Sequence, residues 1–166
     1  MIRFNLPYLT GNEIKRIGEV YDAGHLSGDG HFTKLCSKWF ETNLPCNRAL
    51  LTHSCTAALE MAAILIDIRH GDEIIMPSYT FVSSANAFVL RGGVPVFIDV
   101  REDTLNIDET LIEKAITSKT KAILAVHYAG VACDMDEIVD IAKKYNLYVI
   151  EDAAHALGAK INNKKI

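Results

Sequence analysis

Short apolar runs alternate with segments of helical period along the chain from Arg48 onward. Such alternation is typical of βαβ units, in which a helix joins two neighbouring parallel strands. The apolar runs lack a regular polar alternation, which predicts strands that are buried on both faces. The expected strands are Ala49–Leu51, Glu73–Met76, Val94–Ile98, Ala122–Val126 and Leu147–Ile150. The expected helices are Thr56–Asp67, Val82–Leu90, Asp108–Ile116 and Met135–Tyr145, the last of which stops at Asn146.

Two amphipathic helices are expected before this region, and a hairpin after it. The first helix follows a capping box, Thr10-Gly-Asn-Glu13, and ends at Gly24, with its apolar positions on one face: Ile14, Ile17, Val20 and Tyr21. The second ends before Pro45, and we expect its apolar and aromatic stripe to pack in a core: Phe32, Leu35, Cys36, Trp39 and Phe40. In the tail, Asn162-Asn163 is turn-prone and predicts the first arm of a hairpin.

Composition places the chain among globular proteins. A chain of 166 residues is long enough for one domain with its own core, since domains of roughly 100–150 residues are commonest. Hydrophobic residues make up 49% and charged residues 23%, which excludes a disordered or low-complexity chain. The net charge of −4 disfavours a nucleic-acid binder that relies on neutralising phosphates. The four cysteines show no C-x-x-C spacing, which favours reduced thiols over a zinc site or a disulfide framework.

The sequence shows no pattern of an export signal or a membrane span. Asn5 and Pro7 interrupt the N-terminal apolar residues, unlike the unbroken stretch of a secretory signal. The most apolar segment, Ala57–Ile68, contains Glu60 and Asp67 and is shorter than the roughly 20 residues that a bilayer requires. We therefore expect a cytoplasmic protein without a membrane partner.

Candidate chemistry gathers just after the expected strands, where ligands of open α/β sheets bind. Thr52–Ala58 opens a helix with hydroxyl groups and small residues, which favours either a phosphate cradle or a plain helix cap. Pro77–Asn86 offers polar and aromatic groups, and an aromatic ring there can stack on a flat cofactor. Core packing of Tyr79 or Phe81 is the alternative that we prefer from the pattern alone.

The expected last strand ends in two carboxylates, Glu151 and Asp152. Burying a carboxylate is costly unless it is paired or functional, so we expect one of them to meet a cation. Alternation along a strand aims the two at opposite faces, and only one should face the ligand site. His155 and His127 follow strand ends as well, and for each a structural role is the alternative.

Taken together, these segments resemble the DegT/DnrJ/EryC1/StrS family of sugar aminotransferases, which use pyridoxal 5′-phosphate. The resemblance implies a three-layer α/β fold with a mainly parallel sheet, like the large domain of the fold-type I (aspartate aminotransferase-like) enzymes. It covers nearly the whole chain and rests on these segments: Phe4–Leu9, Leu26–Gly30, Thr52–Leu59, Gly71–Ser84, Gly93–Asp99, Val126–Gly130 and Glu151–His155.

The resemblance also implies roles for seven residues at the cofactor. Groups around Cys55, Thr56 and Ala57 would hold its phosphate, and Phe81 would stack on its pyridine ring. Asp152 would pair with the protonated ring nitrogen and keep the ring cationic, so that the ring can accept electrons. His155 would approach the ring hydroxyl, and Ser84 would line the site.

The implied activity is transfer of an amino group from glutamate to C4 of a dTDP-4-keto-6-deoxyhexose, a step in making enterobacterial common antigen, by a homodimer. The family's Schiff-base lysine lies in a serine-containing motif that is not reached by Ile166, and none of Lys160, Lys164 and Lys165 stands in that setting. We therefore assign no catalytic residue and expect residues 1–166 to be the N-terminal part of the cofactor-binding large domain, without the small C-terminal domain. Alone, this part should be poorly stable and inactive.

Two other functions stay open at this point. Some members of the family dehydrate the sugar and carry a histidine in place of the lysine, and the segment that decides lies past residue 166. A non-catalytic fragment or interaction subunit that pairs through an exposed sheet edge is the second alternative. A nicotinamide dehydrogenase is disfavoured because no G-x-G-x-x-G follows any expected strand.

Overall fold

The computed structural model describes residue 2, residues 6–161 and residues 164–165. The chain separates into two compact units, residues 1–51 and residues 52–166, and each is described by itself. Among the described residues, no helix combines the length and the apolar character that crossing a bilayer requires.

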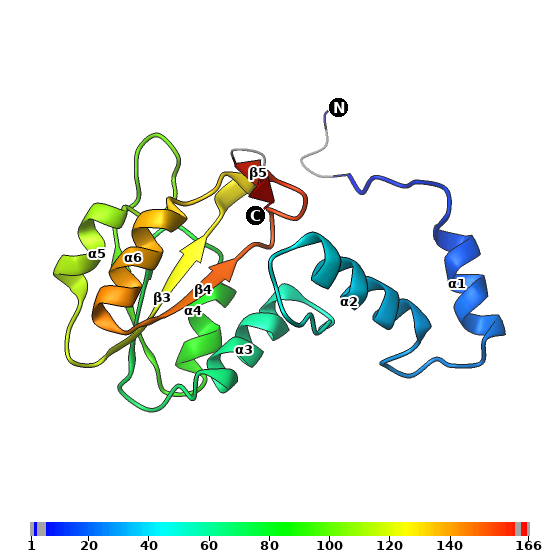
Figure 1. Ribbon diagram of the computed structural model, residues 1–166, viewed down its shortest axis with the longest axis horizontal. Helices are drawn as coiled ribbons and strands as arrows, with labels where there is room; N and C mark the ends of the chain where they lie inside the picture. The colour runs from blue at the N-terminus through cyan, green and yellow to red at the C-terminus, as the bar shows by residue number, and fades with distance from the viewer. Residues whose placement is uncertain (1, 3–5, 162–163, 166) are drawn as a thin grey trace. The chain divides into compact units, whose positions relative to one another are not determined.

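The first unit contains the two predicted amphipathic helices, α1 (Glu13–Asp22) and α2 (His31–Asn43) (Figure 1). The capping box forms only in part, because Asn12 rather than Thr10 is the N-cap residue of α1. The Glu13 carboxylate still accepts a hydrogen bond from the Thr10 amide at 2.7 Å. This bond fixes the backbone at Thr10, just before the helix, to the first residue of α1. The predicted core packing of Trp39 is wrong: its side chain is 46% exposed, because two helices without a sheet offer little surface to bury it.

The predicted strand Ala49–Leu51 is absent. Its residues have no regular structure, and Leu50 is 72% exposed. A strand forms only when its backbone groups bond to a neighbouring strand, and none of the described strands pairs with this segment. An apolar run was therefore not sufficient to predict a strand here.

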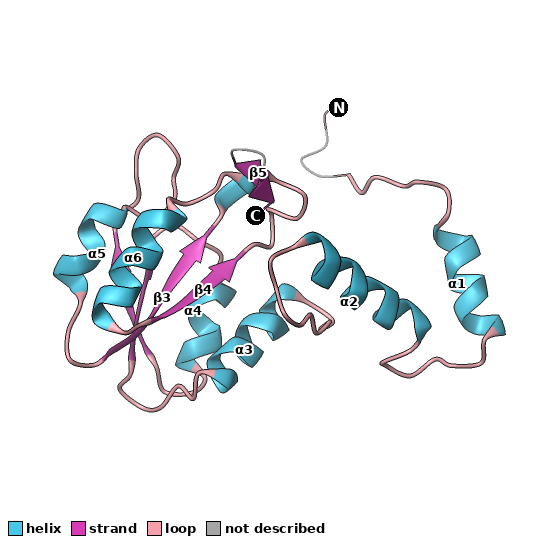
Figure 2. Ribbon diagram, viewed as in Figure 1, coloured by secondary structure: helices cyan, strands magenta, loops and turns pink. Residues whose placement is uncertain are grey.

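The second unit is built on a four-stranded parallel sheet in the order β2-β1-β3-β4. The strands are β1 (Glu73–Pro77), β2 (Val94–Ile98), β3 (Thr120–Val126) and β4 (Tyr148–Asp152). Helices cover both faces of this sheet (Figure 2). On one face lie α3 (Cys55–Leu65) and α4 (Val82–Val89), and on the other lie α5 (Glu109–Ala115) and α6 (Met135–Tyr145). This three-layer α/β arrangement confirms the predicted fold class.

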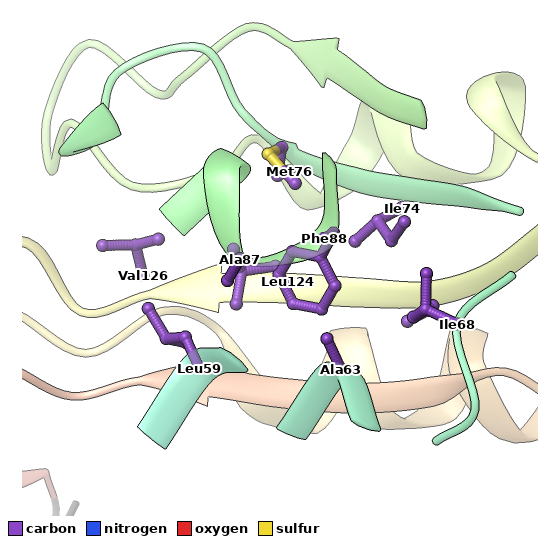
Figure 3. Packing of buried hydrophobic residues seen from close by; sticks show 10 residues of the cluster. Leu59, Ala63, Ile68, Ile74, Met76, Ala87, Phe88, Leu124 and Val126 are labelled. Carbon is purple, nitrogen blue, oxygen red and sulfur yellow. The ribbon is translucent and has the colours of Figure 1, made fainter. Parts of the chain in front are cut away.

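Alternation along the two central strands builds one core on each face. Ile74 and Met76 of β1 point to α3 and α4, whereas Ile75 points to α5 and α6. Figure 3 shows the first of these clusters, in which Phe88 of α4 faces Ala63 of α3 beside the sheet. The central strands are therefore buried on both faces, as predicted.

The outer strands depart from that prediction. In β2 the side chain of Phe97 is 55% exposed, and in β4 that of Tyr148 is 54% exposed. Both strands lie at an edge of the described sheet, where fewer neighbours cover them. The predicted hairpin in the tail is present as β5 (Lys160–Ile161) and β6 (Lys164–Lys165), which pair antiparallel, while Asn162 and Asn163 lie outside the described residues.

Candidate functional site

The segments that follow β1, β3 and β4 meet the N-terminus of α3 around a cavity of about 120 Å³. The structure brings six of the seven predicted cofactor residues to its lining: Cys55, Thr56, Phe81, Ser84, Asp152 and His155. Ala57 is not among the lining residues. Seven further residues line it, and four of them, Thr80, Ser83, His127 and Tyr128, have polar side chains to which the sequence prediction gave no role at the cofactor. Their position after β1 and β3 was the signal that could have found them.

Asp152 is the most buried charged group of this cavity, with 7% of its surface exposed. Its carboxylate accepts hydrogen bonds from the Ser84 hydroxyl at 2.8 Å, the Cys55 thiol at 3.5 Å and the Ala154 amide at 3.2 Å. All three donors are uncharged, and no ion pair to Asp152 is present among the described residues. A buried carboxylate without a cation nearby is poorly compensated, so the cavity favours a cationic ligand group at this point.

The neighbouring Glu151 points away from this cavity. Its side chain is 49% exposed and contacts His127, whose Nε2 lies 2.9 Å from Glu151 Oε2. The prediction that only one of the two carboxylates faces the ligand site is therefore confirmed. The pleat of β4 separates them, because successive side chains leave a strand on opposite faces.

His127 is fully buried between these groups, and its hydrogen bonds define its protonation. The backbone amide of Cys133 donates to His127 Nδ1 at 3.1 Å, so this nitrogen carries no proton. The proton must then sit on Nε2, which donates to Glu151, and the ring is neutral. The His127 amide donates to the backbone oxygen of Asp152 at 3.1 Å, which ties the end of β3 to the end of β4.

Ser84 reaches Asp152 from helix α4 and is itself only 1% exposed. The Thr80 hydroxyl lies 2.9 Å from Ser84 Oγ. Because Ser84 donates its proton to Asp152, Thr80 is the donor in this second bond. The chain of hydroxyl groups holds one carboxylate oxygen of Asp152 in place.

The N-terminus of α3 forms the opposite wall of the cavity. Ser54 is its N-cap residue and accepts a hydrogen bond from the Ala57 amide at 3.1 Å, so that amide is already occupied. The amides of Cys55 and Thr56 precede the first intrahelical bonds and have no acceptor within α3. Together with the positive end of the helix dipole, they suit an anion such as a phosphate.

Aromatic rings flank the cavity on the β1 and β3 side. Phe81 is 70% exposed and Tyr79 is 44% exposed, so the core packing preferred for them from the pattern is wrong. Phe81 is the N-cap residue of α4, which leaves its ring at the cavity wall rather than on the buried face of the helix. The Tyr128 hydroxyl donates to that of Tyr79 at 2.9 Å, and the Tyr128 ring meets the His155 ring edge-on at 5.9 Å.

A wider cavity of about 560 Å³ lies on the α5 and α6 side of the same sheet edge. Arg101 in its lining is already paired with two carboxylates outside the lining, Asp103 at 3.0 Å and Glu109 at 2.6 Å. Asp134 is the N-cap residue of α6, and its carboxylate accepts a hydrogen bond from the Glu137 amide. The smaller cavity at Asp152 is therefore the better candidate for a ligand site.

The Cys55 thiol reports on the charge of Asp152. Desolvation, followed by the nearby Asp152 carboxylate and its hydrogen bond, raises the pKa of Cys55 to about 11. A raised pKa keeps the thiol protonated, so only about one molecule in a thousand carries the thiolate at pH 8. Asp152→Asn removes two of the three causes and lowers this pKa toward 9.0. We expect alkylation of Cys55 by iodoacetamide at pH 8, followed by peptide mass spectrometry, to become about tenfold faster.

Cys133 is the internal control for this measurement. Its pKa is raised to about 12, mainly by burial, and Asp152 is not among the causes. Its alkylation rate should be the same in both proteins. Equal rates at Cys55 before and after the substitution would show that its thiol does not contact the carboxylate.

The fold and the cavity define an α/β protein with a ligand site at the carboxyl ends of a parallel sheet. Residues 7–166 match the model of the DegT/DnrJ/EryC1/StrS aminotransferase family. The chain belongs to this family, which confirms the resemblance seen in the sequence.

The chain is similar over nearly its whole length to curated proteins. It is 41% identical to the spore coat polysaccharide biosynthesis protein SpsC of Bacillus subtilis, over 93% of this chain and 39% of that protein. It is 40% identical to the GDP-perosamine synthase of Caulobacter vibrioides, over 96% of this chain and 43% of that protein. The chain thus spans less than half the length of the curated relatives that it matches.

Solved structures agree with the fold. The aminotransferase of Psychrobacter cryohalolentis matches with a TM-score of 0.92 and 36% identity, over 98% of this chain and 41% of that one. The PLP-form of the sugar aminotransferase Spr1654 of Streptococcus pneumoniae matches with a TM-score of 0.87 and 30% identity, over 99% and 45%. A PMP-form of the same protein also matches. These structures confirm the predicted fold class and pyridoxal 5′-phosphate as the cofactor of this class of protein.

Proposed function

We propose that the cavity at Asp152 binds pyridoxal 5′-phosphate and that the chain takes part in amino transfer to a nucleotide-linked sugar. The observation that carries the proposal is the buried Asp152 carboxylate, which faces the cavity with uncharged donors only. A protonated pyridine nitrogen is the kind of cation that such a carboxylate lacks. Membership in an aminotransferase family supports the same conclusion.

Each wall of the cavity offers a group that suits one part of the cofactor. The free amides of Cys55 and Thr56 at the start of α3 would accept the phosphate, and the exposed Phe81 ring would cover the pyridine face. His155, also in the lining, would approach the ring hydroxyl. When bound, the cofactor supplies a cationic ring that accepts the electrons released as the amino donor loses its α proton. Asp152 keeps that ring protonated, and Ser84 holds Asp152 in place.

The cofactor site is tested by adding pyridoxamine 5′-phosphate, which has no aldehyde to react with surface lysines, and following its fluorescence. We expect saturable binding to the wild-type chain and about tenfold weaker binding to Phe81→Ala, because stacking contributes about 0.5–1.5 kcal/mol. The ring is 70% exposed, so the variant should unfold at the same temperature as the wild type. Val82→Ala, at a neighbour that is 61% exposed and lies outside the lining, is the control. No saturation with the wild type would contradict the proposed function.

We further propose glutamate as the amino donor and C4 of a dTDP-4-keto-6-deoxyhexose as the acceptor, as in dTDP-4-amino-4,6-dideoxygalactose transaminase. The sequence resemblance supports the dTDP-sugar, and relatives named GDP-perosamine synthase support a nucleotide sugar in general. Titration of the chain, loaded with pyridoxamine 5′-phosphate, with dTDP- and GDP-linked 4-keto-6-deoxyhexoses separates the two by their binding affinities. Saturable binding of the GDP-linked sugar alone would overturn the dTDP assignment.

No lysine is among the described residues that line the cavity. A transaminase needs one to hold the cofactor and to move the proton. We therefore propose that these 166 residues bind the cofactor without turnover. Release of the cofactor on dialysis, with no amino sugar formed, is the expected result.

A dehydratase of the same family is the second candidate. One similar structure is a GDP-4-keto-6-deoxymannose-3-dehydratase, with a TM-score of 0.88 and 27% identity over 98% of this chain and 44% of that one. The absence of a lysine from the described cavity lining is compatible with that chemistry. Mass spectrometry of the sugar after incubation with the chain and the cofactor discriminates, because dehydration removes water from the sugar and adds no nitrogen.

A further inference from the structure

We propose that Asn106 is a positioning residue that acts through the Tyr128–Gly130 turn on His155. This inference rests on the proposed function, because it gives His155 its place beside the cofactor. Asn106 lies before α5, outside the lining of the Asp152 cavity, and only 1% of its surface is exposed. A polar amide this deeply buried must be satisfied by its neighbours.

The Asn106 side chain spans the turn that follows β3. Its Oδ1 accepts a hydrogen bond from the Tyr128 amide at 3.0 Å. Its Nδ2 donates to the backbone oxygen of Val131 at 2.9 Å. One amide group thus holds both ends of the Tyr128–Gly130 turn, so the turn cannot change its width without breaking one of these bonds.

The backbone on both sides of this clamp is strained. Ala129 within the turn has φ 51°, and Leu105, directly before Asn106, has φ 59°. A residue with a side chain in the left-handed region costs about 1–3 kcal/mol and persists only where its surroundings enforce it. The turn has its own backbone hydrogen bonds, from the Gly130 amide to the His127 oxygen at 3.2 Å and from the Val131 amide to the Tyr128 oxygen at 3.0 Å. The two Asn106 hydrogen bonds add a buried side-chain constraint to them.

The clamped turn contacts His155 at two places. The Tyr128 ring meets the His155 ring edge-on with 5.9 Å between centroids. Gly130 passes so close that an added Cβ would lie 3.2 Å from the backbone oxygen of His155. Both His155 and Tyr128 line the Asp152 cavity. A turn that relaxes would therefore move the ring that the proposed function places at the cofactor's hydroxyl group.

The test is a double-mutant cycle on the affinity for pyridoxamine 5′-phosphate. We expect Asn106→Ala to weaken binding about fivefold, an ordinary effect of losing two buried hydrogen bonds that position another group. In the His155→Ala background the same substitution should have no further effect, because its target is gone. Effects that multiply would show that Asn106 does not act through His155 and would overturn the inference.

A spectroscopic readout separates positioning from mere stability. The absorbance of bound pyridoxal 5′-phosphate, titrated with pH, reports the ionisation of its ring hydroxyl. Asn106→Ala and His155→Ala should shift the apparent pKa of the cofactor's ring hydroxyl in the same direction. Ile107→Val, which trims the buried neighbour of Asn106, should lower the melting temperature and leave the titration unchanged. A displacement in Ile107→Val equal to that in Asn106→Ala would overturn the inference.

Two further variants guard against a failure to fold. Asn106→Asp still accepts from the Tyr128 amide but buries a negative charge against the Val131 oxygen, and should weaken binding at least as much as Asn106→Ala. Gly130→Ala adds a methyl group against the backbone oxygen of His155. It should shift the same apparent pKa in the same direction. Unfolding of all three variants would identify Asn106 as a structural residue and contradict the proposal. If the wild type itself does not bind the cofactor, the proposed function fails and this inference fails with it.

Discussion

Asp152→Asn will weaken the binding of pyridoxamine 5′-phosphate by roughly 10- to 100-fold, the loss expected when a charge-assisted hydrogen bond becomes a neutral one. The substitution keeps the shape of the side chain and an oxygen for the Ser84 hydroxyl. It removes the negative charge that, in the proposed function, pairs with the protonated ring nitrogen of the cofactor. We expect little net change in stability, because the loss of the hydrogen bond from the Ala154 amide is offset by removal of a poorly compensated buried charge.

This combination of effects is diagnostic, since weak binding and unchanged unfolding cannot both follow from a damaged fold. Affinity is measured by fluorescence titration and stability by urea denaturation. The matched control is Asp134→Asn, at the same edge of the sheet but outside the Asp152 cavity, where asparagine caps α6 as well as aspartate does. Equal affinities for wild type and Asp152→Asn would remove the main support for the cofactor site.

Phe88→Ala will destabilise the second unit by about 3–5 kcal/mol, the usual cost of emptying a fully buried aromatic site. Phe88 is 0% exposed and lies at the centre of the cluster between the sheet, α3 and α4. Alanine would leave a cavity that the packed neighbours Ala63 and Leu124 cannot close. Since small domains have total stabilities of about 5–15 kcal/mol, much of the protein should be unfolded near 37 °C.

Far-UV circular dichroism in urea measures this loss as a lower midpoint at constant slope. Phe97→Ala is the control, because it deletes the same side chain from β2, where Phe97 is 55% exposed. We expect it to cost less than about 1 kcal/mol. Similar losses at both positions would mean that Phe88 is not packed as the structure shows.

The local elements of the protein and its family could be predicted from the order of its residues. Helical period and capping residues depend on neighbours in the chain, so α6 begins at Met135 and ends at Tyr145 as predicted, with Asn146 in the left-handed conformation after it. The strands β1 to β4 fell on their apolar runs for the same reason. Ordered motifs along the chain were sufficient for the family, which the family model then confirmed.

Which of these segments are paired, buried or brought together follows from the three-dimensional fold and could not be predicted from the local sequence. Ala49–Leu51 is as apolar as a strand and has no partner among the described strands, while Phe97 lies on an edge that its sequence does not mark. Pairing and burial depend on residues far away in the chain, which a local pattern does not contain.

The same reason governs the candidate site. The sequence placed the backbone around Cys55 at a phosphate, and it gave no sign that the Cys55 thiol contacts Asp152, 97 positions away. It left His127 and Asn106 without a role, although one is held neutral between Glu151 and Cys133 and the other clamps the turn after β3. Such contacts join separate loops, and only the parallel sheet that gathers the strand ends at one edge puts them within hydrogen-bond distance.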